Sequence, residues 1–157
     1  MISPSLQPIV FTDLDGTLLD HYSYSFEAAI PTLDKLEQLG IPVIPITSKT
    51  FAEVSRLRDQ LNNQHPFIVE NGAAIAIPKN YFVSHLDSWI DQGDFWICPN
   101  SKPRTHWNQL LSKNAQAFTG EYETFTSIVD HRGYQGLQEL TGLNLAQAIL
   151  SNERNYS

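Results

Sequence analysis

Apolar and amphipathic stretches alternate along the first half of the chain. Three short apolar runs, at residues 8–12, 41–46 and 67–69, predict buried strands. Between them, residues 30–39 and 51–61 place apolar side chains at helical spacing. The order strand, helix, strand, helix, strand predicts an α/β fold with a parallel sheet and right-handed crossovers.

Local signals refine these elements. Pro31 falls in the first turn of the first helix, where proline is favoured. Thr50-Phe-Ala-Glu53 is a capping box that opens the second helix, and Arg58 on that helix is expected to face solvent. After the third strand, residues 73–77 and 81–83 are predicted to pair as a hairpin.

The character of the chain changes near residue 84. Aromatic residues gather beyond that point, and two further helices are predicted, at about 104–116 and 132–152. We therefore divide the chain into a first α/β unit, residues 1–84, and a second unit, residues 85–157.

Two carboxylates directly follow the first predicted strand, in Asp13-Leu-Asp15-Gly-Thr17. At a strand end the chain is turning, so both side chains can approach one ligand. This arrangement suits a nucleophile that attacks phosphorus and an acid/base that protonates the leaving oxygen and later activates water. An EF-hand calcium loop is disfavoured because its glycine belongs at position 6 and because this motif follows a strand. Two surface aspartates in a turn are the remaining alternative.

The run Asp13-Leu-Asp-Gly-Thr-Leu-Leu19 resembles the first motif of the haloacid dehalogenase superfamily. The resemblance implies that Asp13 is the nucleophile and a magnesium ligand. It implies that Asp15 is the acid/base and binds the metal through its carbonyl. Thr47, which ends the second predicted strand, matches the superfamily's second motif, whose hydroxyl binds a phosphate oxygen. The implied fold is a Rossmann-like core, a parallel sheet flanked by helices, in the first unit and part of an α+β cap of the C2 type in the second.

Two further segments resemble the mannosyl-3-phosphoglycerate phosphatase family, namely Ile46-Thr-Ser-Lys-Thr50 and Val69-Glu-Asn-Gly-Ala73. The candidate phosphate- or substrate-binding residues are therefore Thr47, Ser48, Lys49, Asn71 and Gly72. The lysine lies where a point charge reaches an anionic substrate, although it is equally typical of a surface position. The asparagine and glycine either shape the mouth of the site or are ordinary turn residues.

The end of the chain, Arg154-Asn-Tyr-Ser157, resembles the cap of the same family. Arg154 either offers a guanidinium fork to an anionic substrate group or is simply solvated.

Superfamily phosphatases carry a third-motif lysine and a fourth motif of acidic metal ligands, Gly-Asp-Gly-x-Asn-Asp. The chain matches neither, so we expect it to be truncated within the cap. Magnesium held only by Asp13 and the Asp15 carbonyl would bind weakly. The core sheet would also keep an exposed edge, which invites pairing with the missing C-terminal half or with a second copy.

The composition limits the kinds of partner that the chain is expected to bind. The chain has 157 residues, 41% of them apolar, and a net charge of −7 without a basic stripe, which disfavours nucleic acid. No apolar run approaches a membrane span of about 20 residues. Cys98 is the only cysteine, which excludes an internal disulfide and predicts a cytoplasmic location.

Two functions follow from these patterns. The first is a magnesium-dependent phosphatase that acts through an aspartyl-phosphate on a small phosphorylated sugar or glycerate, with mannosyl-3-phosphoglycerate as the expected substrate. Other sugar-phosphate phosphatases and phosphomutases share the same first motif. The second is a catalytically inactive or incomplete fragment that binds phosphorylated ligands near Thr47.

Overall fold

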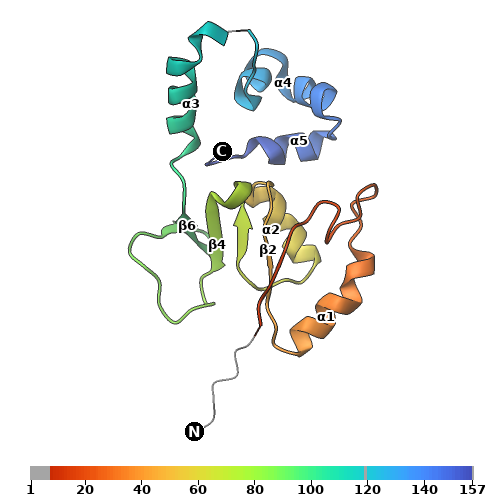
Figure 1. Cartoon of the computed structure of the whole chain (residues 1–157). Helices are drawn as coiled ribbons and strands as arrows, with labels where there is room; N and C mark the ends of the chain where they lie inside the picture. The colour runs from red at the N-terminus through yellow and green to blue at the C-terminus, as the bar shows by residue number, and fades with distance from the viewer. Residues whose placement is uncertain (1–7, 119, 157) are drawn as a thin grey trace.

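The computed structural model describes residues 8–118 and 120–156 (Figure 1). The remaining residues, 1–7 at the start of the predicted first unit, 119, and Ser157 of the cap motif, lie outside the described residues. The strands are β1 Val10–Thr12, β2 Val43–Pro45, β3 Phe67–Val69, β4 Ala74–Pro78, β5 Ile90–Gln92 and β6 Phe95–Pro99. The α-helices are α1 Ile30–Gln38, α2 Phe51–Gln60, α3 Arg104–Asn114, α4 Phe125–Thr141 and α5 Leu145–Asn152. Short 3-10 turns are η1 Glu27–Ala29, η2 Glu70–Gly72 and η3 Gln116–Phe118.

The first three strands are neighbours in sequence order. β1 pairs with β2 in parallel, and a parallel bridge between Ile46 and Ile68 joins the end of β2 to β3. Helices α1 and α2 form the crossovers between them. The predicted α/β fold with a parallel sheet is confirmed, and the carboxyl ends of all three strands therefore meet at one edge.

The predicted hairpin between residues 73–77 and 81–83 is wrong. β4 pairs antiparallel with β3 on one side and with β6 on the other, where Ile75 lies opposite Cys98. Residues 81–83 form bends instead. β6 is the better partner because it brings Ile97 into the core, where this side chain is 2% exposed, whereas Val83 is fully exposed.

The pairing of β4 with β6 concerns the predicted division of the chain into two units at residue 84. β5 and β6 lie beyond that residue, yet they extend the sheet to the order β3-β4-β6-β5. The division into two units stays a prediction. From the strand pairing, we propose that the boundary lies close to residue 100, between β6 and α3.

Helix α2 confirms one local prediction and corrects another. The Thr50 hydroxyl accepts a hydrogen bond from the Glu53 amide, and the Glu53 carboxylate accepts one from the Thr50 amide, as in the predicted capping box. Arg58, by contrast, is buried instead of facing solvent. Its guanidinium lies over the rings of Phe67 and Phe95, and the second of these arrives on β6, outside the predicted first unit.

Three helices follow the sheet. In Figure 1 they gather at one end of the strands, with α5 closest to them. The helix predicted at 104–116 is α3, but the one predicted at 132–152 is two helices, α4 and α5. The break is at Gly142, which adopts a left-handed conformation as a C-cap, and Asn144 then caps α5. A small separate core of Ile128, Leu137 and Ala148 joins α4 to α5.

Candidate active site

A hollow of about 480 Å³ opens at the edge where the three parallel strands end. Its lining includes four of the candidate residues, which are Asp13, Thr47, Ser48 and Asn71. Asp13 comes directly after β1, Thr47 follows β2, and Asn71 follows β3. Side chains separated by up to 58 positions are therefore brought together because the strands that carry them are neighbours.

Backbone hydrogen bonds fix the loop that carries Thr47. Its amide donates to the carbonyl of Ile68, and its carbonyl accepts from the amide of Asn71 at 3.0 Å. Thr47 is buried, and its hydroxyl accepts a hydrogen bond from the Lys49 amide at 3.2 Å. A hydroxyl that accepts in this way can also donate its hydrogen to an oxyanion in the hollow.

The turn after β3 has an uncommon backbone. Glu70 and Asn71 both have positive φ, of 51° and 59°, and Gly72 follows with φ 89°. Consecutive left-handed residues are costly for side chains other than glycine and asparagine, so the surrounding contacts must hold this turn. Gly72 lies outside the hollow that contains Asp13 and instead lines an adjacent one, which shares Asn71.

The remaining two candidates, Asp15 and Lys49, contact each other. The Lys49 ammonium nitrogen lies 2.9 Å from a carboxylate oxygen of Asp15, in a partly exposed ion pair. Gly16 has a positive φ of 72°, which lets the chain turn back so that the Leu19 amide donates to the Leu14 carbonyl. Leu14 is buried in the core, while the aspartates on either side of it are exposed.

The C-terminal tail, residues 152–156, lies against the same edge of the sheet. Glu70 is 1% exposed, and its carboxylate oxygens accept hydrogen bonds from the amides of Asn155, at 2.8 Å, and Tyr156, at 2.9 Å. The Arg154 guanidinium donates to the carbonyl of Ser48 at 3.1 Å. We refer to these contacts together as the tail clamp.

The charge of Glu70 also acts on its surroundings. Burial raises the pKa of Tyr156, and the negative charge of Glu70 raises it further. For Arg104, burial lowers the pKa and the charge of Arg154 adds to this, while Glu70 opposes both. Arg104 joins the tail from α3, with its amide donating to the Asn155 carbonyl at 2.7 Å and its guanidinium to the Asn152 carbonyl at 3.1 Å.

A family model described as haloacid dehalogenase-like hydrolase matches residues 10–90, which contain both aspartates, Thr47 and the turn at Asn71. The chain belongs to this family. The family assignment confirms the superfamily resemblance of the first motif.

Two curated relatives are similar to this haloacid dehalogenase-like chain. A glucosyl-3-phosphoglycerate/mannosyl-3-phosphoglycerate phosphatase of Methanococcoides burtonii is 39% identical over 151 residues, which are 96% of this chain and 54% of that protein. A protein of the same name from Persephonella marina is 53% identical over 73 residues, or 46% of this chain and 27% of that protein. The chain thus spans about half the length of the first relative, and its match to the second covers 27% of that protein.

Solved structures of haloacid dehalogenase proteins share the fold. A haloacid dehalogenase-like hydrolase from B. subtilis superposes with a TM-score of 0.52 at 17% identity, over 96% of this chain and 53% of that one. A phosphatase of the superfamily from Bacteroides thetaiotaomicron gives a TM-score of 0.54 at 16% identity, over 76% and 39% of the two chains. At these identities the likeness concerns the fold alone, and it agrees with the predicted Rossmann-like core.

Oxygen donors at the site suit a magnesium ion. The Asp13 carboxylate and the Asp15 carbonyl are hard ligands, and magnesium usually takes one or two carboxylates together with waters and substrate phosphate. Within residues 8–118 and 120–156, no group of three or more histidine, cysteine, aspartate or glutamate side chains could hold a metal ion. A magnesium ion at this edge would therefore need ligands besides the side chains of the described residues, such as water and substrate phosphate. In the same part of the chain, no helix has both the length and the apolarity needed to cross a membrane.

The role of Glu70 is not evident from the sequence. The residue lies in the segment Val69-Glu-Asn-Gly-Ala73, and its position directly after an apolar strand is the one local signal that its carboxylate lies at the site edge. Its partners are backbone amides 85 and 86 positions away, which no local pattern could indicate. For Arg154, the contact with Ser48 shows that its side chain reaches the site edge.

Proposed function

We propose that this chain supplies the nucleophile and phosphate-binding residues of a magnesium-dependent phosphomonoesterase, with mannosyl-3-phosphoglycerate as substrate. The observation that carries the proposal is the meeting of Asp13, Thr47 and Asn71 at one hollow. The substrate class is supported by the name of the Methanococcoides burtonii relative, a glucosyl-3-phosphoglycerate/mannosyl-3-phosphoglycerate phosphatase at 39% identity.

The proposed reaction uses the two aspartates in turn. An Asp13 carboxylate oxygen forms a bond to phosphorus as the bond from phosphorus to the ester oxygen breaks, and Asp15 gives its proton to that oxygen. Asp15 then takes a proton from water, whose oxygen bonds to phosphorus and releases phosphate from Asp13. Bound magnesium, held by the Asp13 carboxylate and the Asp15 carbonyl, would neutralise charge on the phosphate oxygens.

Other candidate residues act on the phosphate group. The buried Thr47 hydroxyl donates to a phosphate oxygen, while Ser48 and Asn71 line the same hollow and Gly72 continues the turn. Lys49 exchanges its partner: it leaves the Asp15 carboxylate, 2.9 Å away, for the incoming phosphate. This exchange would free Asp15 to carry the proton that the leaving oxygen needs.

The edge of β1 is a proposed pairing surface. Among the described residues, β1 pairs with β2 alone, and Phe11 on β1 is 56% exposed. An unpaired edge with exposed apolar side chains invites another strand. We propose that this strand comes from sequence outside the present chain or from a second copy, and that the protein works in the reducing cytoplasm.

A second candidate function is a binding module that holds phosphorylated ligands without turnover. The observation that favours it is that, within the described residues, no group of three or more histidine, cysteine, aspartate or glutamate side chains could hold a metal ion. Thr47 and Lys49 would still attract a phosphate group in such a module.

Phosphate release by the full chain with magnesium decides between the two. Mannosyl-3-phosphoglycerate, glucosyl-3-phosphoglycerate and a panel of sugar phosphates would be compared, with Asp13→Asn as the matched control. The phosphatase proposal expects release that Asp13→Asn abolishes. Binding of inorganic phosphate without release from any of these substrates would favour the binding module, and the absence of both would contradict both functions.

A further inference from the structure

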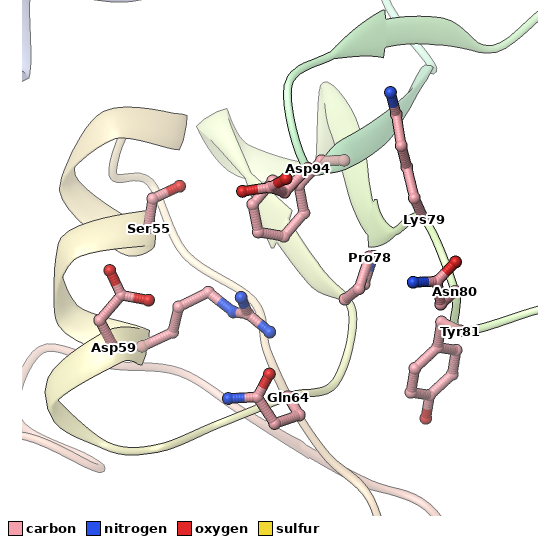
Figure 2. A pocket seen from close by; sticks show the side chains of 10 residues that line it. Ser55, Asp59, Gln64, Pro78, Lys79, Asn80, Tyr81 and Asp94 are labelled. Atoms are coloured by element: carbon pink, nitrogen blue, oxygen red, sulfur yellow. The ribbon is translucent and has the colours of Figure 1, made fainter.

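A second hollow, of about 730 Å³, lies at the opposite end of the sheet from Asp13. It is bounded by the C-terminal half of α2, the loop that leads into β3, and the end of β4. Figure 2 shows Ser55 and Asp59 projecting from α2 on one side, with Pro78, Lys79 and Asn80 on the other. None of its lining residues belongs to the candidate active site.

Arg58 lines this hollow and is 6% exposed. A buried arginine is normally paired with a carboxylate, because leaving its charge uncompensated in the interior is costly. Within the described part of the chain, no carboxylate lies within ion-pair distance of Arg58. Its contacts are a hydrogen bond from one terminal nitrogen to the His65 carbonyl, at 3.2 Å, and the faces of Phe67 and Phe95.

Two buried donors at this hollow also lack partners. Among the residues that the structure describes, neither the Arg58 Nε nor the Ser55 hydroxyl has a hydrogen-bond partner. The two residues are three positions apart on α2 and therefore share a helix face. Burial lowers the pKa of Arg58, and the charge of Asp59 offsets only part of this. The Arg58 Nε and the Ser55 hydroxyl are thus buried beside the same hollow without an acceptor among the described residues.

The other charges around the hollow limit the charge of the ligand that it can bind. Lys79 is engaged, since its ammonium group donates to both carboxylate oxygens of Asp91 at 2.8 Å. Asp59 and Asp94 are exposed lining residues, and their negative charge would repel a dianion more strongly than a monoanion. A planar carboxylate also matches the guanidinium fork.

We propose that this hollow binds a small monocarboxylate, held by the Arg58 guanidinium and the Ser55 hydroxyl. A modest shift of the two side chains opens their unpartnered atoms to the ligand. The site is independent of the proposed phosphatase chemistry, because it lies at the other end of the strands.

The proposal is tested by titrating sodium acetate into the full chain at constant ionic strength. A parallel titration with sodium chloride is the control for nonspecific anion effects. Backbone amide NMR signals of Ser55, Gln64 and Asn80 should shift and saturate, with a dissociation constant on the order of millimolar. Arg58→Met should weaken binding about tenfold or more, because it removes a charged donor but keeps much of the packing volume. Arg56→Met removes the same charge from the exposed face of α2 and should leave the binding curve unchanged.

Ser55→Ala is a second variant, and it leaves the aromatic contacts of Arg58 intact. It therefore still tests the site if Arg58→Met does not fold. It should weaken acetate binding several-fold. The proposed site would be contradicted if the amide shifts did not saturate. It would also be contradicted if Ser55→Ala bound acetate as tightly as the unmodified chain. Tighter binding of inorganic phosphate than of acetate at these amides would overturn the assignment to a monocarboxylate.

Discussion

The Thr50 hydroxyl donates a hydrogen bond to the backbone carbonyl of Leu150 at 2.9 Å, across 100 positions of sequence. The same hydroxyl caps α2 by accepting from the Glu53 amide at 3.2 Å. One buried oxygen therefore stabilises the start of α2 and also connects α2 to α5. This connection lies directly after Lys49 in the chain.

Replacing Thr50 with valine should lower the free energy of unfolding by about 1–3 kcal/mol, since it removes a helix cap and a buried hydrogen bond. Urea denaturation measures the change. Thr50→Ser keeps the hydroxyl and loses only a methyl group, so it should cost clearly less. Equal losses in the two variants would mean that the hydroxyl contributes little.

Glu70→Gln should also destabilise the chain, by about 1–3 kcal/mol, because an amide NH2 group would face one of the two tail amides that the carboxylate now accepts. Equilibrium urea denaturation is again the measurement. Glu139→Gln makes the same charge change at an exposed position of α4 and should change stability by less than about 0.5 kcal/mol. If the two variants match, the tail clamp does not stabilise the fold.

Lys49→Met should weaken the binding of inorganic phosphate about tenfold, because the ammonium group that pairs with Asp15 would no longer be available for the phosphate. Calorimetry measures this without requiring turnover. Lys79→Met removes the same charge from a lysine paired with Asp91, away from the hollow at Thr47, and serves as the control. An unchanged phosphate affinity in Lys49→Met would show that this lysine only pairs with Asp15.

Stability should fall at alkaline pH through Tyr156. Burial, and then the charge of Glu70, raise the pKa of this phenol above its ordinary value of 10.0. The folded state therefore favours the protonated phenol, so the stability linked to it is fully present below pH 10 and is lost as the pH rises through the higher folded value. Tyr156→Phe keeps the ring and should flatten the decline above pH 10 in thermal unfolding curves. A decline of the same steepness in this variant would assign it to other groups.

The β1 edge gives a prediction about association. Phe11→Lys places a charge on an unpaired strand edge and should reduce concentration-dependent self-association in sedimentation experiments. Tyr22→Lys makes a similar change at an exposed position outside the strands and should have little effect. If the edge does not mediate association between copies, the two variants will sediment alike.

The positions of Asp13, Asp15 and Thr47 relative to their strands could be predicted because the signals are local. Each follows a short apolar run, and the order of strands and helices already implies that the ends of the strands meet. The pairing of β4 with β6 could not be predicted in this way, because the partner strand comes after an irregular stretch, 79–89, and the short strand β5.

The burial of Arg58 follows from the same missed pairing. Helical spacing places this residue at the flank of the apolar stripe on α2, where solvent is the usual neighbour. Phe95 reaches it only because β6 joins the sheet. Likewise, the amides bound by Glu70 belong to a tail whose path depends on how α5 packs against α2.

The tail clamp has a practical consequence for handling the protein. Because the Asn155 and Tyr156 amides are bound to Glu70 and Arg154 reaches Ser48, the last described residues lie beside the candidate site, and any segment attached to them starts from that position. An affinity tag placed there would compete for space with ligands of Thr47. A tag ahead of β1 joins the chain at the opposite end of that strand from Asp13, so recombinant protein for ligand measurements is best tagged at its N-terminus.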